Sequence, residues 1–503
     1  MILARIEGDS FARATAALAS RPALLFFAIA LIFTMARIAA LFFTDADLGP
    51  DEAQYWVWSS DPDLGYFSKP PLIAWTIAAT TALFGDAEWA VRLASPFYHL
   101  GAAVFVFLLA RRLFGPAAGF WSGAGWITLP GVGLSSALIT TDAPLLFFWS
   151  AALYFFFFIL TTTRNRAAGG AALGLAIGLG LLAKYAMAFF LIGAMLAFLI
   201  SPAVRKNMRL QDLAAAALVA ALVIAPNLWW NAVNGFQTIA HTAANAKWGP
   251  DWFHPGSFAE FLAGQFAVFG PILIGLLIWG VATGSRRRSE VPTRGVELAL
   301  LAFVIAPLVI VAAQALISRA HANWAATAYP AAILLASVWA LRSNLRPLLA
   351  ASLVLHVAAT AVFMAMFADF GLADRLGFSD AVKRLRGWEV QGATIRAAAA
   401  PYDAILVDDR ELTASVSYYA RGDRPVVAWN SNHQVDSYFE AFKAFNPDRT
   451  RSALFVSIYP EPIALAGLFA ETTPLGETSV DVKQERRRTY YLYGVSGYRP
   501  PRG

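Results

Sequence analysis

Long apolar stretches, separated by short polar loops, occupy most of the chain up to about residue 370. A helix that crosses a membrane needs about 20 apolar residues, and the pattern predicts about eleven such helices. The fifth and sixth are short and nearly continuous, so they could also form one long helix, which would leave about ten. The expected helices lie near residues 22–43, 90–110, 117–134, 144–161, 169–183, 185–200, 212–230, 259–283, 296–317, 324–341 and 347–368.

The charges of the loops discriminate between these two counts. With the N-terminus in the cytoplasm, every second loop is also cytoplasmic, and these loops hold most of the basic residues, among them Arg286, Arg287 and Arg288. Loops on the opposite side carry few, such as Lys69 and Lys184. This asymmetry follows the positive-inside rule for the larger count only. We therefore expect a multi-pass protein of a bacterial inner membrane with its C-terminal region in the periplasm.

The pattern changes after about residue 375. Short apolar runs at 404–407, 425–429 and 453–458 are typical of buried strands, and polar stretches near 410–420 and 433–445 are compatible with helices. Strands that alternate with helices indicate a small α/β domain. The expected fold class is an all-α polytopic membrane bundle with a small C-terminal periplasmic α/β domain. The expected domains are 1–370, with an outer loop at about 44–89, and 375–503.

Composition agrees with a membrane protein and excludes several kinds of chemistry. Of the 503 residues, 58% are hydrophobic and 14% charged, whereas soluble domains carry about 25% charged residues. The chain has no cysteine, which removes disulfides, cysteine-ligated zinc and cysteine nucleophiles. The net charge of +6 resides mainly in loops between apolar runs. It therefore reflects membrane topology, and membrane lipids rather than nucleic acid are the expected surroundings.

The first outer loop holds the most informative polar residues. Asp51 and Glu52 follow the first apolar run directly, and Lys69 precedes Pro70 and Pro71 later in the same loop. Transfer of a sugar from a lipid phosphate needs a carboxylate that takes a proton from the acceptor hydroxyl, and a cation that stabilises the departing phosphate. Asp51 and Lys69 could fill these two roles. The alternative is a solvated loop whose charges only mark the membrane boundary.

Three further outer positions combine charge with an apolar run. Asp142 lies where a predicted helix begins, and on its own it is more typical of a helix N-cap before Pro144. Lys184 separates two short apolar runs, where it could bind an anionic phosphate or extend to the membrane surface. One short loop contains a cation, an imidazole and an amide, which could bind phosphate or sugar hydroxyls. The alternative is that the loop is an anchor at the membrane interface. Its residues are Arg319, His321 and Asn323.

The order of these motifs resembles a known family. An acidic pair after the first helix is followed by YFSKPPL at 66–72, WAVRLAS at 89–95, TDAPLLFFW at 141–149 and LAKY at 182–185. Together they resemble the polyprenyl-phosphate-dependent membrane glycosyltransferases of the C-type fold, including protein O-mannosyltransferase-like proteins and the aminoarabinose transferase of lipid A. The resemblance covers most of 22–368 and implies a helix bundle with outer helices and a C-terminal periplasmic domain.

The resemblance also assigns roles to residues. It implies catalysis by the acidic residues Asp51, Asp142 and Glu52. It implies donor phosphate binding by Lys69, Tyr66, Lys184, Arg319, His321 and Asn323. The aminoarabinose transferase has a glutamate, associated with a bound metal, where this chain has Ser68. We therefore expect no metal ligands and no required cofactor, and Ser68 disfavours the alternative of a divalent metal.

The expected function is transfer of a sugar, with inversion, from a polyprenyl-phosphate donor to a periplasmic acceptor. Lipid A or lipopolysaccharide core is the first acceptor to consider. A protein O-glycosyltransferase of the same fold is one alternative, and a transporter of lipid-linked sugars is another. A transporter favours internal repeats and interrupted helices near the membrane midplane, and the sequence shows no such repeat.

Overall fold

The computed structural model describes residues 21–244, 253–283, 291–430, 432, 434–465, 467–483 and 486–500. The chain forms two compact units. The first, here called the helical unit, comprises the described residues up to Phe42, Pro70–Ile73 and Arg92–Met364. The second, here called the mixed unit, comprises Phe43–Lys69, Ala74–Val91 and the described residues from Ala365 onward.

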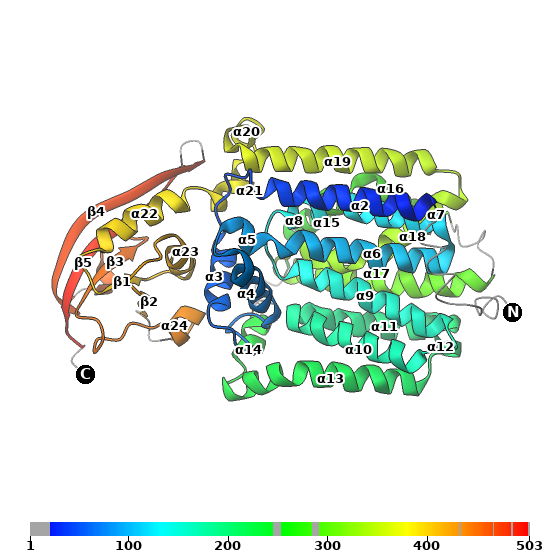
Figure 1. Ribbon diagram of the computed structural model, residues 1–503, viewed down its shortest axis with the longest axis horizontal. Coiled ribbons are helices and arrows are strands. Elements are labelled where there is room, and N and C mark those ends of the chain that lie inside the picture. The colour runs from blue at the N-terminus through cyan, green and yellow to red at the C-terminus, as the bar shows by residue number, and fades with distance from the viewer. Residues whose placement is uncertain are drawn as a thin grey trace. The chain divides into compact units, whose positions relative to one another are not determined.

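Long apolar helices that run alongside one another build the helical unit (Figure 1). Eight helices within the described residues are long and apolar enough to cross a membrane, or nine if one bent pair counts as a single span. These eight are Arg21–Ala40, Glu88–Phe114, Asp142–Thr161, Arg166–Ala183, Leu210–Val233, Thr293–Ile317, Ala322–Arg342 and Arg346–Ala368. The structure therefore confirms a mostly helical, multi-pass membrane architecture, whereas the expected number of eleven is not reached by these criteria.

Three expected spans account for the difference. The run at 117–134 is divided between α7 (Pro116–Thr128) and α8 (Pro130–Ser136), because Pro130 begins a new helix. The run at 185–200 holds only a 3₁₀ turn, η2 (Tyr185–Ala188), and the short helix α11 (Phe189–Ile200). The run at 259–283 bends by 107° between α15 (Pro255–Phe269) and α16 (Pro271–Ala282).

Two glycines allow this bundle to pack. Gly270, at the bend, has φ of +94°, and a Cβ there would lie 2.1 Å from His356 Nε2. Gly174 brings α10 (Arg166–Ala183) against α13 (Leu210–Val233), where a Cβ would lie 2.2 Å from the carbonyl oxygen of Ala216. Small residues at such positions let helix backbones approach closely in membranes. The bend and the tight helix pair therefore both depend on glycine.

The mixed unit contains a five-stranded sheet in the order β2-β1-β3-β5-β4. Strands β1 (Ala404–Val407), β2 (Val426–Ala428) and β3 (Ser452–Ser457) are parallel. They alternate with α23 (Arg410–Tyr419) and α24 (Tyr438–Phe442), and α22 (Trp388–Ala399) precedes β1. The antiparallel hairpin of β4 (Phe469–Lys483) and β5 (Arg486–Tyr498) completes the sheet. The small C-terminal sheet is thus confirmed, and the hairpin was not predicted.

The first outer loop belongs to this same unit and is tied to the C-terminal segment by hydrogen bonds. Leu48 N donates to the Tyr419 hydroxyl, which donates to the Glu88 carboxylate. Trp388 N donates to Asp47 Oδ2 at 2.6 Å. Burial and the nearby Glu88 carboxylate raise the pKa of Asp47 to about 7. Through these contacts α23 packs against α3 (Pro50–Ser59), the helix that carries the acidic pair.

Candidate active site

The two residues of the acidic pair have different environments on α3. Glu52 is 4% exposed, and its Oε2 accepts a hydrogen bond from Gly49 N at 2.9 Å. This bond is one half of a capping box, and Gly49 has no side chain for the other half. The side chain of Asp51 is 54% exposed. Pro50 occupies the first helical position, where its fixed φ favours the helix and no N–H is required. Glu52 therefore has a structural partner, and Asp51 presents its carboxylate to solvent.

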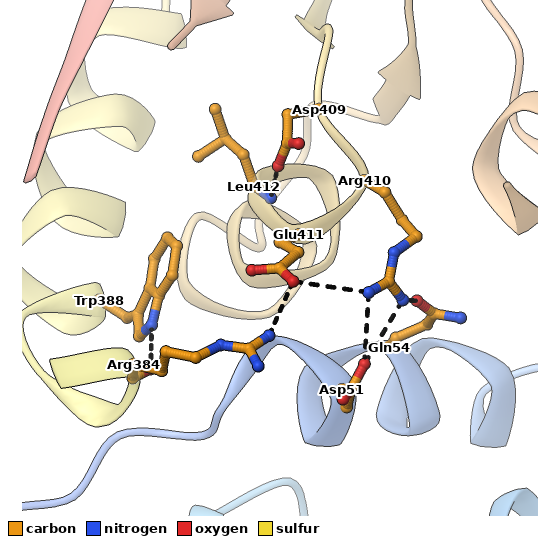
Figure 2. A network of polar contacts seen from close by, with 8 residues as sticks. All are labelled: Asp51, Gln54, Arg384, Trp388, Asp409, Arg410, Glu411 and Leu412. Carbon is orange, nitrogen blue, oxygen red and sulfur yellow. Dashed lines mark hydrogen bonds and ion pairs between the residues drawn. The ribbon is translucent and has the colours of Figure 1, made fainter. Parts of the chain in front are cut away.

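An arginine of the C-terminal segment lies beside Asp51 (Figure 2). Arg410 Nη1 donates to Gln54 Oε1 at 2.7 Å, and its two terminal nitrogens lie 3.4 and 3.5 Å from Asp51 Oδ1. Gln54 is buried one turn after Asp51 on the same face of α3. The guanidinium therefore has its closest contact with an uncharged amide and looser contacts with the carboxylate.

The start of α23 fixes the position of Arg410. Asp409 is the N-cap, and its Oδ1 accepts a hydrogen bond from Leu412 N at 2.8 Å. Glu411 Oε1 lies 3.6 Å from Arg410 Nη2 and accepts a shorter bond of 2.8 Å from Arg384 Nη2. Figure 2 shows Arg384 and Arg410 on either side of the Glu411 carboxylate. The helix cap thus holds Arg410 at the first helical position, facing α3.

Tyr66 and Lys69 belong to a tight turn of the same loop. Tyr66 N donates to the carbonyl of Lys69 at 3.1 Å, and the Tyr66 ring stacks on Trp58 with centroids 4.7 Å apart. The Tyr66 hydroxyl donates to the Trp58 carbonyl at 3.0 Å and accepts from Asp63 N at 3.0 Å. Burial raises the pKa of Tyr66 above its usual value. These contacts give Tyr66 a role in loop structure, and a phosphate contact through its hydroxyl stays a prediction.

A second group of expected residues meets within the helical unit. Lys184 Nζ donates to Asp142 Oδ1 at 2.7 Å, and Asn323 Nδ2 donates to Asp142 Oδ2 at 2.8 Å. Both charged side chains are mostly buried, with 14% of Asp142 and 24% of Lys184 exposed. The N-cap interpretation of Asp142 is wrong, because Asp142 is the first helical residue of α9 (Asp142–Thr161) and Thr141 occupies the cap position. Its carboxylate is instead shared between a cation and an amide.

Neighbouring polar contacts hold the segments that carry Lys184 and Asn323. Lys184 has extended backbone between α10 and η2, and the next residue, Tyr185, donates from its hydroxyl to Asn227 Oδ1 at 2.7 Å. Asn323 lies in the 3₁₀ helix η4 (Ala322–Ala328), whose Ala322 carbonyl accepts from Gln265 Nε2 at 3.3 Å. Both side chains that contact Asp142 therefore come from short non-α-helical segments that neighbouring hydrogen bonds hold in place.

Arg319 and His321 lie near Asn323 in sequence but do not share its contacts. Both are exposed, and the His321 ring lies edge-on to Trp324 with centroids 5.5 Å apart. In the described part of the chain, neither side chain forms a hydrogen bond or an ion pair. The loop therefore contributes its amide to the Asp142 cluster, while its imidazole and guanidinium remain available to an outside ligand.

Ser68 supplies a hydroxyl as its only side-chain donor group. Serine is a weak ligand for a divalent ion compared with a carboxylate, and no group of three or more His, Asp or Glu residues suited to a metal occurs among the described residues. Within the mixed unit, the exposed Asp51 carboxylate lies beside the guanidinium of Arg410 and the amide of Gln54. An exposed carboxylate suits general-base chemistry, and cationic and amide groups suit the binding of an anion.

Comparison with solved structures defines the class of protein. ArnT from Cupriavidus metallidurans bound to undecaprenyl phosphate superposes with a TM-score of 0.65 at 19% identity, covering 94% of this chain and 97% of that one. The apo state of ArnT gives a TM-score of 0.64. An archaeal oligosaccharyltransferase from Archaeoglobus fulgidus gives 0.51 at 15% identity, covering 89% of this chain and 72% of that one. The chain has the fold of the C-type membrane glycosyltransferases.

Sequence comparison identifies the family. Residues 68–230 match the family described as dolichyl-phosphate-mannose-protein mannosyltransferase. A lipid A galacturonosyltransferase, RgtD of Rhizobium johnstonii, is 38% identical over 434 residues, which cover 85% of this chain and 90% of that protein. The undecaprenyl phosphate-aminoarabinose transferase of Shewanella sediminis is 37% identical over 75 residues, 12% of this chain and 14% of that protein. The chain belongs to the family of polyprenyl-phosphate-dependent membrane glycosyltransferases and is an enzyme of that family.

Proposed function

We propose that this enzyme transfers a uronic acid from a polyprenyl-phosphate donor to lipid A at the outer face of the bacterial inner membrane. The observation that carries the proposal is the 38% identity, along nearly the whole chain, to a lipid A galacturonosyltransferase. The departure at Ser68 from the aminoarabinose transferase pattern supports a donor sugar other than aminoarabinose. The proposal includes a cytoplasmic N-terminus, eleven crossings, a membrane domain over 1–370 and a periplasmic domain over 375–503.

In the proposed reaction, Asp51 accepts the proton of an acceptor hydroxyl. The hydroxyl oxygen forms a bond to the anomeric carbon of the donor sugar while the bond from that carbon to the phosphate oxygen breaks. The electron pair leaves with the polyprenyl phosphate, and the configuration at the anomeric carbon inverts. The exposure of Asp51 supports its role, since a general base must come within hydrogen-bond distance of the hydroxyl. Glu52, which caps α3, leaves Asp51 as the stronger candidate for the base.

The proposal assigns the departing phosphate to cationic and amide groups. Lys69 in the first loop, and Arg319 and His321 in the helical unit, supply donors or positive charge. Lys184 is already paired with Asp142, so it contributes a directed hydrogen bond more than net charge. Asn323 binds the same carboxylate and would act mainly by orienting it. No cofactor enters the proposed reaction, because the phosphate is itself the leaving group.

The experiment that tests this proposal is mass spectrometry of lipid A. Lipid A from a deletion strain is compared with that of the same strain carrying the wild-type gene or Asp51→Asn. We expect lipid A to bear an additional hexuronic acid only with the wild-type gene. If lipid A is identical in all three strains, lipid A is not the acceptor. A neutral hexose or a pentosamine in place of the uronic acid would contradict the proposed donor.

A protein acceptor is the second candidate, and one observation favours it. The family description that matches residues 68–230 is that of a protein mannosyltransferase. If the periplasmic glycoproteins of the deletion strain lose a sugar on serine or threonine while lipid A is unchanged, this candidate replaces the first. The identity to the lipid A enzyme extends over far more of the chain, and for that reason we place lipid A first.

A further inference from the structure

The guanidinium of Arg410 is held in place without being closely paired with a carboxylate. Its short contact is with the uncharged Gln54, whereas the oxygens of Asp51 and Glu411 lie 3.4 to 3.6 Å away. Good N–H···O hydrogen bonds have donor–acceptor distances of about 2.7 to 3.2 Å. The side chain is 38% exposed, so an outside ligand can reach it.

Arg386 in the same unit shows what a fully paired arginine looks like. Its Nη1 and Nη2 bind the two carboxylate oxygens of Asp374 at 3.0 and 2.9 Å, and its side chain is 10% exposed. That is the two-point geometry in which arginine binds carboxylates and phosphates most strongly. Arg410 has the same donors available, but among the described residues no carboxylate binds it in that geometry.

The neighbours of Arg410 keep it in this state. Arg384 Nη2 donates to Glu411 Oε1 at 2.8 Å, and the same oxygen lies 3.6 Å from Arg410 Nη2. Gln54 lies almost fully buried behind the guanidinium and accepts from Nη1. Because Asp409 caps the helix, the backbone of Arg410 is fixed at the start of α23. One cation is therefore fixed beside the candidate base.

We propose that Arg410 binds an anionic group, a phosphate, on the acceptor substrate next to the hydroxyl that reacts. This inference rests on the proposed function and adds a determinant of acceptor specificity to it. In an inverting displacement the attacking hydroxyl and the leaving group lie on opposite faces of the anomeric carbon. Asp51 must contact the attacking hydroxyl, and Arg410 adjoins Asp51, so Arg410 lies on the acceptor's side of the reaction and not on that of the departing phosphate.

The test measures acceptor and donor dependence separately, with the purified full-length protein in lipid nanodiscs. The variants are Arg410→Gln, Arg410→Lys and, as a matched control, Arg487→Gln, which removes an exposed arginine of the same unit that pairs with Asp481. For Arg410→Gln and a phosphorylated lipid A acceptor we expect a rise of about ten- to hundredfold in the acceptor KM, as for a lost hydrogen bond to a charged group. The donor KM and kcat should stay near those of the wild type.

Two further arms make the result specific. Lipid A from which the phosphates have been removed should show the same KM with wild type and Arg410→Gln, because the anion that Arg410 binds is gone. Arg410→Lys should recover part of the affinity, since lysine keeps the charge but lacks the two-point geometry. The control Arg487→Gln should behave as wild type. Thermal unfolding of each variant shows whether the fold is intact.

Several results would overturn the inference. A rise in the donor KM with an unchanged acceptor KM would place the anion on the donor sugar. A loss of kcat alone would make Arg410 part of the proton transfer. An equal rise in the acceptor KM with phosphorylated and dephosphorylated lipid A would show that Arg410 does not bind a phosphate. Failure of the wild type to use lipid A at all is a different outcome, because it contradicts the proposed function itself.

Discussion

Lys184 Nζ donates to Asp142 Oδ1 at 2.7 Å, and this contact joins two segments that lie 42 residues apart in sequence. Both side chains are mostly buried at the ends of apolar helices. An isolated charge in such surroundings is costly, and a partner of opposite sign reduces that cost. The pair therefore stabilises the end of the bundle and presents a directed hydrogen-bond donor at the same place.

Substitutions at the pair should separate these two effects. Lys184→Gln and Asp142→Asn should each lower stability, because each leaves one partly buried charge alone, and the double variant should recover part of the loss. The expected coupling energy is about 0.5 to 3 kcal/mol in a double-mutant cycle of unfolding. If Lys184 also binds the donor phosphate, Lys184→Gln will raise the donor KM in the double variant too. Strict additivity of the two stability losses would contradict the pairing.

Glu52 offers a direct comparison between a capping role and a catalytic one. Glu52→Gln keeps an oxygen that can accept from Gly49 N, so activity should stay close to wild type and stability should fall less than in Glu52→Ala. Glu52→Ala removes this hydrogen bond and should cost about 0.5 to 2 kcal/mol of stability. Chemical unfolding and a transfer assay measure the two effects. If Glu52→Gln folds normally but abolishes transfer, that result would assign a catalytic role to the Glu52 carboxylate.

Asp47 should make the stability of the mixed unit depend on pH. Its pKa in the folded protein is raised to about 7 by burial and by Glu88, from an ordinary value of 3.8. The folded protein therefore binds this proton more tightly than the unfolded chain, so the contribution of Asp47 to stability falls as pH rises from about 4 to about 7. Asp47→Asn can still accept from Trp388 N and should gain relative to wild type across that window, by no more than about 4 kcal/mol.

Asp374 provides a control of opposite sign. The hydrogen bonds from Arg386 hold the pKa of Asp374 below its usual value, so its contribution is present at neutral pH and is lost in acid. Asp374→Asn should therefore lose stability relative to wild type at pH 7, and the difference should shrink as the pH falls below about 4. Unfolding curves of the three proteins between about pH 2 and 8 measure both trends. Parallel curves for wild type and Asp47→Asn would contradict the assigned shift.

The parts of the fold that could be predicted are those with a strong local pattern. Apolar runs such as 144–161 gave the long helices, and the continuous apolar runs of β1 and β3 gave strands that are buried on both faces. The bend at Gly270 and Pro271 lies inside an apolar run that suits one helix equally well. The β4–β5 hairpin escaped prediction because β4 is mostly polar and exposed, with residues such as Glu471 and Glu477.

The candidate site could be predicted as a set of residue types but not as a set of contacts. The sequence predicts functional roles for Asp51, Asp142 and Lys184 because each charged residue adjoins an apolar run. Glu52 is held by Gly49 N, a contact that the sequence does not signal, because a glycine at the cap position lacks the Ser or Thr side chain of a capping box. Arg410 lies 359 residues from Asp51, and only the fold brings them together. Its one local signal is the position after the cap Asp409, just beyond a predicted strand.

In the proposed mechanism, Asp51 is the base that activates the acceptor hydroxyl. The most direct measurement is the transfer rate of purified wild type and Asp51→Asn with a polyprenyl-phosphate uronic acid and lipid A, alongside donor binding and thermal unfolding. We predict that Asp51→Asn folds and binds the donor as the wild type does, while transfer falls by about 10²- to 10⁴-fold, the usual contribution of general-base catalysis. A transfer rate equal to that of the wild type would contradict the mechanism.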